Sequence, residues 1–261
     1  MPRFKLLIEY AGTRYSGWQI QKNARTVQGE LHRVVRGATG ESAFELAGAG
    51  RTDAGVHALG QVAHLEVRAT LPPDTLKRRL NHALPADINI LSVTRVSHRF
   101  HARHDALSRT YVYQIARRRT AFAKPLVWWV REPLDIDRMR RAAALFTGRQ
   151  DFRGFTDDDP AEKSTLVEIA AVHIDEVGNA LLVRVDGSHF LWKMVRRMVG
   201  VLVEVGKGGL DASAIPALLR DPKGLPARLT APGSGLFLAR VTYPGDLETP
   251  LPSLPVNLPH V

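Results

Sequence analysis

The sequence predicts an α+β protein made of two halves, each with the element order β-α-β-β-α-β. Two observations support this fold class. Alternating, strand-like stretches are interleaved with amphipathic segments of helical period, and the same order occurs twice along the chain. A doubled order of this kind is the ferredoxin-like, split βαβ arrangement. We therefore expect two antiparallel sheets covered by helices, with a cleft between the halves.

The first half is expected to span residues 1–105. Strands are predicted over residues 3–10, 43–49, 61–67 and 88–97. Thr26 is a suitable N-cap for a helix that runs to about Ala38, because its hydroxyl can accept a backbone N–H. Asp74 is predicted to cap a second helix, which Pro85 stops.

The second half is expected to span residues 106–248 and to repeat the order. Its strands are predicted over residues 111–116, 165–175, 180–186 and 236–243. Helices are expected from the Asp135 cap to Gly148, over residues 188–205, and over Asp211–Arg220. The Pro-rich residues 249–261 are expected to form a peripheral tail.

Composition narrows the class of protein. Hydrophobic residues make up 44% of the 261 residues, which is enough for packed cores. The chain has no cysteine, so disulfides and thiolate metal sites are excluded and a reducing compartment is favoured. We find no signal-peptide pattern and no apolar run near the roughly 18 residues of a membrane span. A soluble, cytoplasmic protein that does not bind membranes is expected.

The charge balance indicates a polyanionic partner. The formal net charge is +10, and 28 of the 36 basic residues are arginine. The planar guanidinium group suits phosphate, so nucleic acid is the partner that this surplus favours. The alternative is a basic protein whose arginines reflect genome composition or heat tolerance.

A carboxylate within a turn of small residues is the strongest candidate for chemistry. Asp53 lies in the segment Ala49–Ala58, two positions after Arg51. Gly50 and Gly55 allow unusual backbone conformations and the close approach of a ligand. The structural alternative is that Asp53 only closes an Asx-turn.

Short blocks with a fixed order extend over nearly the whole chain. They are Tyr10–Gln19, Thr26–Gly29, the segment around Asp53, Phe100–Arg103, Arg109–Tyr113, Gly148–Phe152, Met194–Gly200 and Ala231–Leu236. In these blocks the chain resembles the tRNA pseudouridine synthases of the TruA type. The resemblance implies the pseudouridine synthase fold, with two halves flanking a basic cleft. It also implies a homodimer that isomerises uridine at positions 38, 39 and 40 of the tRNA anticodon stem-loop, without cofactor or metal.

The supposed reaction assigns a role to Asp53. The C1′–N1 bond breaks, the uracil turns, and C5 is joined to C1′. An ionised carboxylate beside the sugar can act as a nucleophile or as a base. Covalent addition and removal of a sugar proton both remain open.

Four further residues are given roles, two of them, Arg196 and Tyr111, through the resemblance. Arg196 matches the basic residue that keeps the carboxylate ionised, with Arg51 as the local candidate. The alternative for Arg196 is an exposed helix charge. Tyr111 matches the tyrosine that stacks on the target base, although a strand tyrosine is often core packing. Leu236 is expected to supply an apolar wall of the pocket, or else to be an ordinary strand leucine.

The remaining arginines are expected to position the RNA through its phosphates. The candidates are Arg14, Arg78, Arg79, Arg103 and the cluster Arg117–Arg119. His98, His101 and His104 are spaced like metal ligands, but the neighbouring arginines oppose a cation, so roles in turns or near phosphate are favoured. Two other functions are weighed: an RNA-binding protein without turnover, and an N-glycosidase. A glycosidase normally needs a second carboxylate, and none accompanies Asp53.

Overall fold

The computed structural model describes residues 1–121, 123–221, 224–247 and 250–251. Its contacts divide the chain into two compact units. The first is Met1–Leu107 together with the segment that begins at Phe237, and the second contains Ser108–Leu236. Both units contain strands and helices, which confirms the α+β class. The predicted tail lies outside the described residues, apart from residues 250–251.

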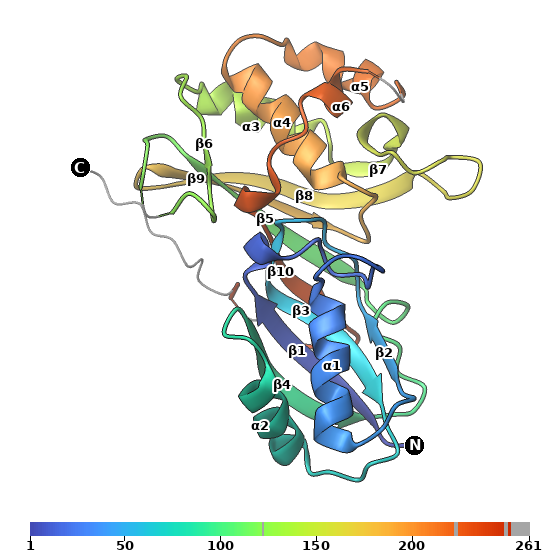
Figure 1. Ribbon diagram of the computed structural model, residues 1–261. Coiled ribbons are helices and arrows are strands. Elements are labelled where there is room, and N and C mark those ends of the chain that lie inside the picture. The colour runs from blue at the N-terminus through green and yellow to red at the C-terminus, as the bar shows by residue number, and fades with distance from the viewer. Residues whose placement is uncertain (122, 222–223, 248–249, 252–261) are drawn as a thin grey trace. The chain divides into compact units, whose positions relative to one another are not determined.

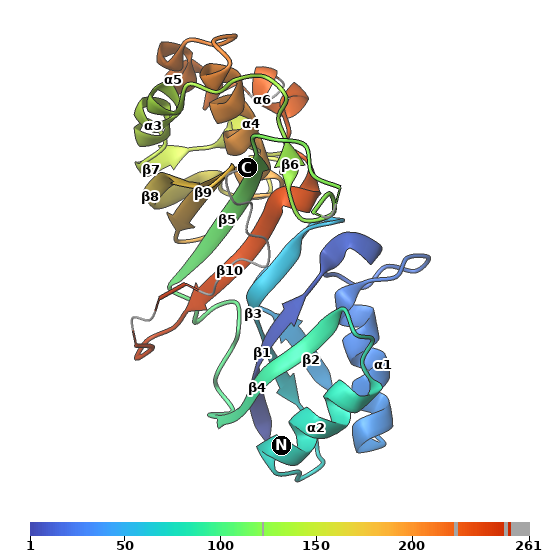
Figure 2. The ribbon, with the colours of Figure 1, turned by 90° about the vertical axis from the view of Figure 1, so that its left-hand side faces the viewer.

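The sheet of the first unit has the strand order β4-β1-β3-β10, and β2 also pairs with β3 (Figure 2). Its strands are β1 (Arg3–Tyr10), β2 (Glu45–Gly48), β3 (His57–Glu66), β4 (Ile88–Val96) and β10 (Leu236–Thr242). The pairings of β3 with β1 and β2 are antiparallel, whereas β10 runs parallel to β3, with Phe237 opposite His57. The sequence analysis assigned this last strand to the second half.

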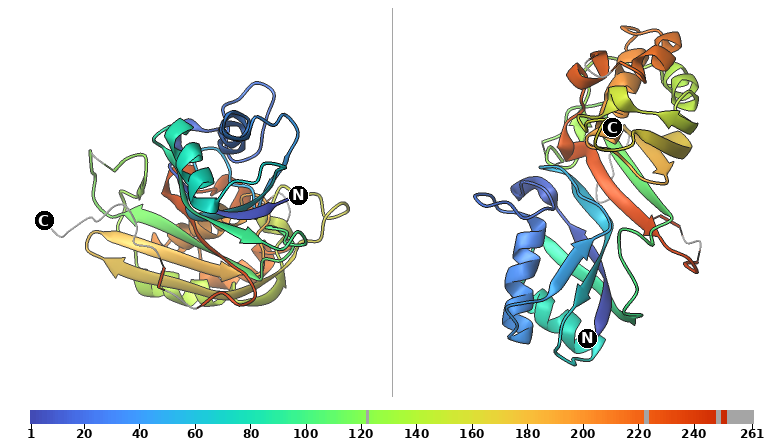
Figure 3. Two further views of the ribbon diagram at one scale, coloured as in Figure 1. Left: turned by 90° about the horizontal axis from the view of Figure 1, so that it is seen from below. Right: turned by 90° about the vertical axis from the view of Figure 1, so that its right-hand side faces the viewer.

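Two helices cover one face of this sheet (Figure 3, right). In β1 every second residue is buried, from Phe4 to Tyr10, which is the period expected of a strand with one face on a core. Helix α1 (Val27–Thr39) begins at Thr26, whose hydroxyl accepts the Gly29 N–H as predicted. For helix α2 (Pro73–Ala83) the predicted N-cap, Asp74, is wrong. Pro72 is its N-cap residue, and Asp74 lies in its first turn. Pro73 has its φ fixed near the helical value, so the helix begins there, two residues earlier than an Asp74 cap predicts.

The second unit has the strand order β5-β9-β8-β7, and the short β6 pairs with β5. Its strands are β5 (Ser108–Ala116), β6 (Trp128–Trp129), β7 (Gly148–Asp151), β8 (Leu166–Val177) and β9 (Ala180–Gly187). The long pairings are antiparallel, whereas β6 runs parallel to β5. The sequence analysis missed β6 and β7, which have two and four residues.

Helices lie over one face of this second sheet (Figure 1). They are α3 (Ile136–Ala144), α4 (Met194–Gly206), α5 (Ile215–Leu218) and α6 (Leu225–Arg228). Asp135 caps α3 by accepting the Arg138 N–H, as predicted, but α3 ends at Ala144, before Gly148.

Two of the predicted helices in this unit are wrong in extent. The helix expected over residues 188–205 begins only at Met194, because Lys193 has a left-handed backbone. The helix expected over Asp211–Arg220 is a 3-10 turn followed by the four residues of α5. None of the helices in the described part of the chain has the length and apolar character that a membrane crossing requires.

Candidate functional site

Asp53 lies in a tight turn between β2 and β3 of the first unit. The Val56 N–H donates to the Asp53 carbonyl at 3.2 Å, and Gly55 has a φ of 75°. The Asp53 side chain is half-buried and Arg51 is exposed. The turn therefore presents a carboxylate at its surface without requiring the cost of full burial.

The loop that follows β1 packs against this turn and holds its backbone in place. The Trp18 N–H donates to the Thr52 carbonyl at 3.0 Å, and the Gly55 N–H donates to the Tyr15 carbonyl at 3.3 Å. Gly17 packs so closely that a Cβ there would lie 2.5 Å from the Thr52 oxygen. Gly17 also has a φ of 93°, which favours glycine. The backbone on both sides of Asp53 is thus fixed by a segment about forty residues away.

Side chains of β1 and β3 complete this support. The Gly12 N–H donates to His57 Nδ1 at 3.0 Å, so His57 carries its ring proton on Nε2. The Tyr10 hydroxyl and Thr52 Oγ1 are 2.8 Å apart, and burial raises the pKa of Tyr10 to about 12. Gln61 Nε2 donates to the Gly50 carbonyl at 3.0 Å. The sequence analysis quoted Tyr10 and Gly12 only as parts of a block, because a fold is needed to show what they contact.

Tyr111 lies on β5 of the second unit, opposite Val185 on β9. It is 9% exposed, and its ring meets Phe190 edge-on with a centroid distance of 5.0 Å. This edge contact fixes the orientation of the Tyr111 ring. The packing role and the stacking role are therefore compatible.

Arg196 lies in the first turn of α4 and is half-buried. Its Nε donates to the Ala231 carbonyl at 2.7 Å, and the Ala231 N–H donates back to the Arg196 carbonyl at 3.1 Å. Gly200 allows this approach, because any Cβ there would overlap the Leu229 carbonyl. Arg196 is therefore a held guanidinium and not an exposed helix charge.

The segment after Ala231 is held by Tyr113, which the sequence analysis did not single out. The Tyr113 hydroxyl donates to the Pro232 carbonyl at 2.8 Å, and a Cβ on Gly235 would lie 2.5 Å from the Tyr113 ring. Burial raises the pKa of Tyr113, and the positive charge of Arg196 partly opposes the rise. Leu236 follows at 5% exposure. Arg196 and the segment that leads to Leu236 thus form one fixed group.

The predicted site residues fall in both units. Asp53 and Arg51 belong to the first unit, whereas Tyr111 and Arg196 belong to the second, as does Leu236 at its end. Each group is locally well held. That the two groups act on one nucleotide stays a prediction.

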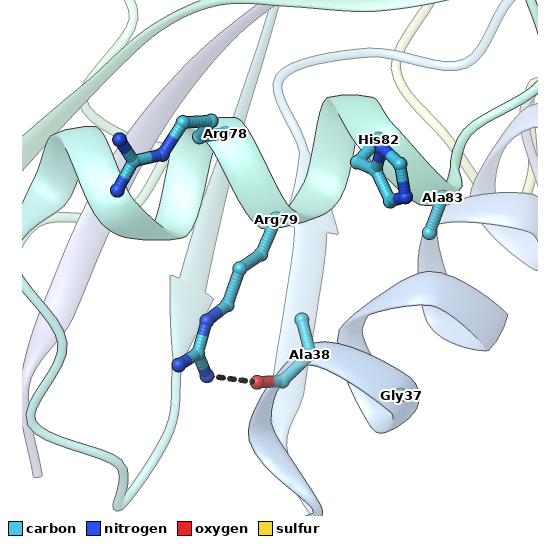
Figure 4. Close-up of a pocket in the computed structure, with 6 residues that line it drawn as sticks. All are labelled: Gly37, Ala38, Arg78, Arg79, His82 and Ala83. Carbon is cyan, nitrogen blue, oxygen red and sulfur yellow. Dashed lines mark hydrogen bonds between the residues drawn. The ribbon is translucent and has the colours of Figure 1, made fainter.

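The candidate phosphate-binding arginines of the first unit are all exposed: Arg14, Arg78, Arg79 and Arg103. Arg78 and Arg79 line a hollow of about 480 Å³ between α1 and α2. In Figure 4 their side chains point in different directions, and Arg79 reaches the end of α1, where Nη1 donates to the Ala38 carbonyl at 3.1 Å. Arg79 thus also satisfies a carbonyl that a helix C-terminus leaves open.

The arginine cluster after β5 is partly committed to the protein. Arg117 donates to Glu176 Oε2 at 2.9 Å and to the Gly178 carbonyl at 2.7 Å. Arg119 is exposed and lies 5.9 Å from the centre of the Trp129 ring. Within this cluster, Arg119 is exposed, whereas Arg117 and Arg118 are partly buried.

Two histidines, His64 and His101, accept backbone N–H groups near the end of the first unit and hold the chain there. His101 Nδ1 accepts the N–H groups of Arg103 and His104, so it does serve in a turn. His101 also groups with Glu45 and His64, whose ligand atoms all lie within 4.8 Å of one another. His64 accepts the Ala102 N–H at Nδ1, and its Nε2 lies 2.9 Å from Glu45 Oε1. Both ring nitrogens of His64 are thus engaged, and a cation would have to displace the bond to Glu45.

Comparisons with known proteins agree in one family. The family model described as tRNA pseudouridine synthase matches residues 6–105 and 142–244. The chain is 40% identical over 245 residues to tRNA pseudouridine synthase A of Acetivibrio thermocellus, covering 93% of this chain and 100% of that relative. It is 41% identical to the Rhodopseudomonas palustris protein of the same name and 37% identical to tRNA pseudouridine synthase A 2 of Bacillus cereus, with the same coverage.

A solved structure, the archaeal box H/ACA sRNP Nop10-Cbf5 complex, matches more distantly. The match covers 78% of this chain and 44% of that chain, with 12% identity and a TM-score of 0.39. This likeness is too weak to carry an argument.

Proposed function

This chain belongs to the tRNA pseudouridine synthase family and is an isomerase that acts on tRNA, and on that premise we propose its site and its reaction in detail. The proposed substrate is uridine in the tRNA anticodon stem-loop, at positions 38, 39 and 40. The proposed reaction needs no cofactor or metal. A homodimer in the cytoplasm, where tRNA is found, is part of the same proposal.

Asp53 is the proposed catalytic residue. When the C1′–N1 bond breaks, positive character develops on the sugar and negative charge on the uracil. A carboxylate can add to C1′ or remove the proton from C2′, and both routes are chemically open. The uracil then turns and C5 bonds to C1′. On the first route this breaks the bond between Asp53 and C1′, and on the second Asp53 returns the proton to C2′. N1 gains a proton, and the C5 hydrogen is released to solvent. The observation that carries this assignment is that the loop after β1 fixes the backbone on both sides of Asp53, which is an ionisable group.

The second unit is proposed to hold the flipped nucleotide. Tyr111 stacks on the uracil, a contact worth roughly 1–3 kcal/mol per base. Leu236 forms an apolar wall beside it. Arg196 supports the ionised form of Asp53, since a nearby cation offsets the loss of solvent around a carboxylate. The hydrogen bond between Arg196 and the Ala231 carbonyl supports this proposal, because it holds the guanidinium in one place.

The exposed arginines are proposed to orient the RNA. Arg51 lies next to the turn and is the proposed contact to the target nucleotide. Contacts to phosphates position an RNA but carry little base information. The proposed contacts of this kind are Arg14, Arg78, Arg79, Arg103 and the cluster Arg117–Arg119.

The proposed reaction is tested with tRNA transcripts tritiated at C5 of uridine. Isomerisation releases tritium while the base stays attached, and transcripts with cytidine at positions 38, 39 and 40 should release none. Free uracil would instead indicate an N-glycosidase. Tight binding without release by the wild-type protein would indicate an RNA-binding protein without turnover. Either result would overturn the proposal.

A further inference from the structure

An exposed indole lies in the loop between β9 and α4, one helical turn before Arg196. Trp192 is 50% exposed, whereas Trp18 in the first unit is 1% exposed. A single exposed apolar side chain is ordinary on a protein surface and needs no explanation. The surroundings of Trp192 are less ordinary.

The loop holds Trp192 in a defined position. Its backbone N–H donates to Asp158 Oδ2 at 3.1 Å. The next residue, Lys193, is the sole residue other than glycine with positive φ in the described part of the chain, at 61°. It is also the N-cap of α4 without any side-chain cap, although a cation at this end opposes the helix dipole. The backbone conformation, the missing side-chain cap and the charge of Lys193 thus all go against local preference, as is common at functional sites.

Ion pairs compensate for this arrangement. Lys193 Nζ lies 4.4 Å from the centre of the Trp192 ring and 2.9 Å from Asp157 Oδ2. Asp157 also accepts a hydrogen bond from the buried Arg197. The indole therefore packs against a lysine ammonium group that an ion pair holds, which restricts the ring before any ligand binds. A preorganised ring loses little conformational freedom when it binds a ligand.

The same ion pairs reduce the repulsion that carboxylates near Trp192 would exert on the phosphates of RNA. Burial raises the pKa of Asp157, but the hydrogen bonds from Lys193 and Arg197 outweigh burial and lower it. Asp158 is likewise paired, with Lys163 at 2.8 Å. With their charges matched by cations, these carboxylates repel phosphate much less than their number suggests.

We infer that Trp192 stacks on an unpaired nucleobase of the bound tRNA, which is a contact outside the proposed catalytic group. The inference rests on the proposed function. Aromatic rings bind bases without sequence preference, because every base has a π-face. Charged groups contact Trp192: Lys193 lies against its ring and Asp158 accepts its backbone N–H, whereas the preceding Leu191 is buried. An exposed ring beside charged groups suits a base flanked by phosphates better than it suits a protein interface, which needs a wider apolar area.

The test compares Trp192→Leu, which keeps apolar bulk, with Trp192→Phe, which keeps an aromatic ring. Leu166→Ala is the control, since Leu166 is 46% exposed in the same unit. We expect Trp192→Leu to weaken binding of an unmodified tRNA transcript about 5- to 150-fold, and Trp192→Phe and the control to bind like the wild type. Because stacking releases no counterions, the slope of log affinity against log salt should stay unchanged.

Three outcomes would overturn the inference. These are wild-type affinity in Trp192→Leu, a smaller salt slope in Trp192→Leu, or a loss of affinity that accompanies a lower molecular mass in sedimentation. The last would place Trp192 at a contact between protein copies. Tritium release by the wild type is measured on the same transcript. Its absence would count against the proposed function, whereas normal release with unaltered Trp192→Leu binding counts against this inference alone.

Discussion

Adding one methyl group at Gly17 should impair the aspartate turn without changing Asp53 itself. In the Gly17→Ala variant the new Cβ would lie 2.5 Å from the Thr52 oxygen and 3.2 Å from the Asp53 carbonyl carbon. An ordinary contact begins at 3.4 Å. The Thr52–Asp53 backbone must therefore move by about 1 Å, which for a positioned catalytic group costs on the order of 100-fold in rate.

Stability should fall as well. A residue with a side chain in the left-handed region costs about 1–2 kcal/mol. The hydrogen bond from the Trp18 N–H to the Thr52 carbonyl is weakened, which adds about 0.5–1.5 kcal/mol. The expected loss for Gly17→Ala is thus about 1.5–3.5 kcal/mol in the free energy of unfolding.

Gly40→Ala separates these two effects. Gly40 ends α1 with a φ of 74°, and no heavy atom lies within 4 Å of an added Cβ. This variant shares the conformational cost but leaves the turn untouched, so it should lose stability and keep the wild-type rate. Rates are measured as single-turnover tritium release well below both melting temperatures, and stabilities by urea denaturation. Equal rates in Gly17→Ala and Gly40→Ala would refute the claim that the loop after β1 fixes the turn around Asp53.

Three further results are expected. Tyr111→Phe should slow isomerisation while tRNA affinity falls only modestly, and unchanged single-turnover rates would remove the hydroxyl from the mechanism. Alanines across Arg117–Arg119 should reduce the salt dependence of tRNA binding, measured as the slope of log affinity against log salt, and an unaltered slope would exclude this cluster. Burial and the charges of neighbouring histidines hold the pKa of His101 below its usual 6.5. The unfolded chain therefore takes up the proton first, and stability is lost as pH falls below about 6.5. In His101→Gln the free energy of unfolding should fall less between pH 7 and pH 5, and equal losses in both proteins would contradict this role.

Local chemistry made part of the fold predictable. Thr26 and Asp135 begin their helices because one hydroxyl or carboxylate accepts a nearby N–H, which depends only on adjacent sequence. The same reasoning was wrong at Asp74, because Pro73 fixes the start of the helix two residues earlier than an Asp74 cap predicts. It was also wrong before Met194, because the left-handed Lys193 is stabilised by a carboxylate 36 residues away.

The site shows the same division. The turn around Asp53 was predictable, since small residues around a carboxylate form a local pattern, and the catalytic role of Asp53 stays a prediction. The support of this turn was not predictable, because Gly17 and His57 act through contacts with distant backbone. Tyr113 is similar. Its place in an alternating strand predicts a core residue, and only the contact with Pro232 shows that it positions the segment before Leu236.

The most direct test of the account is the Asp53→Asn variant, which keeps the shape of the side chain and removes its charge. Single-turnover tritium release is measured at saturating tRNA, alongside the dissociation constant for the same transcript. The account predicts that release is abolished while binding stays within a few-fold of the wild type. Release at a rate near that of the wild-type protein would contradict it.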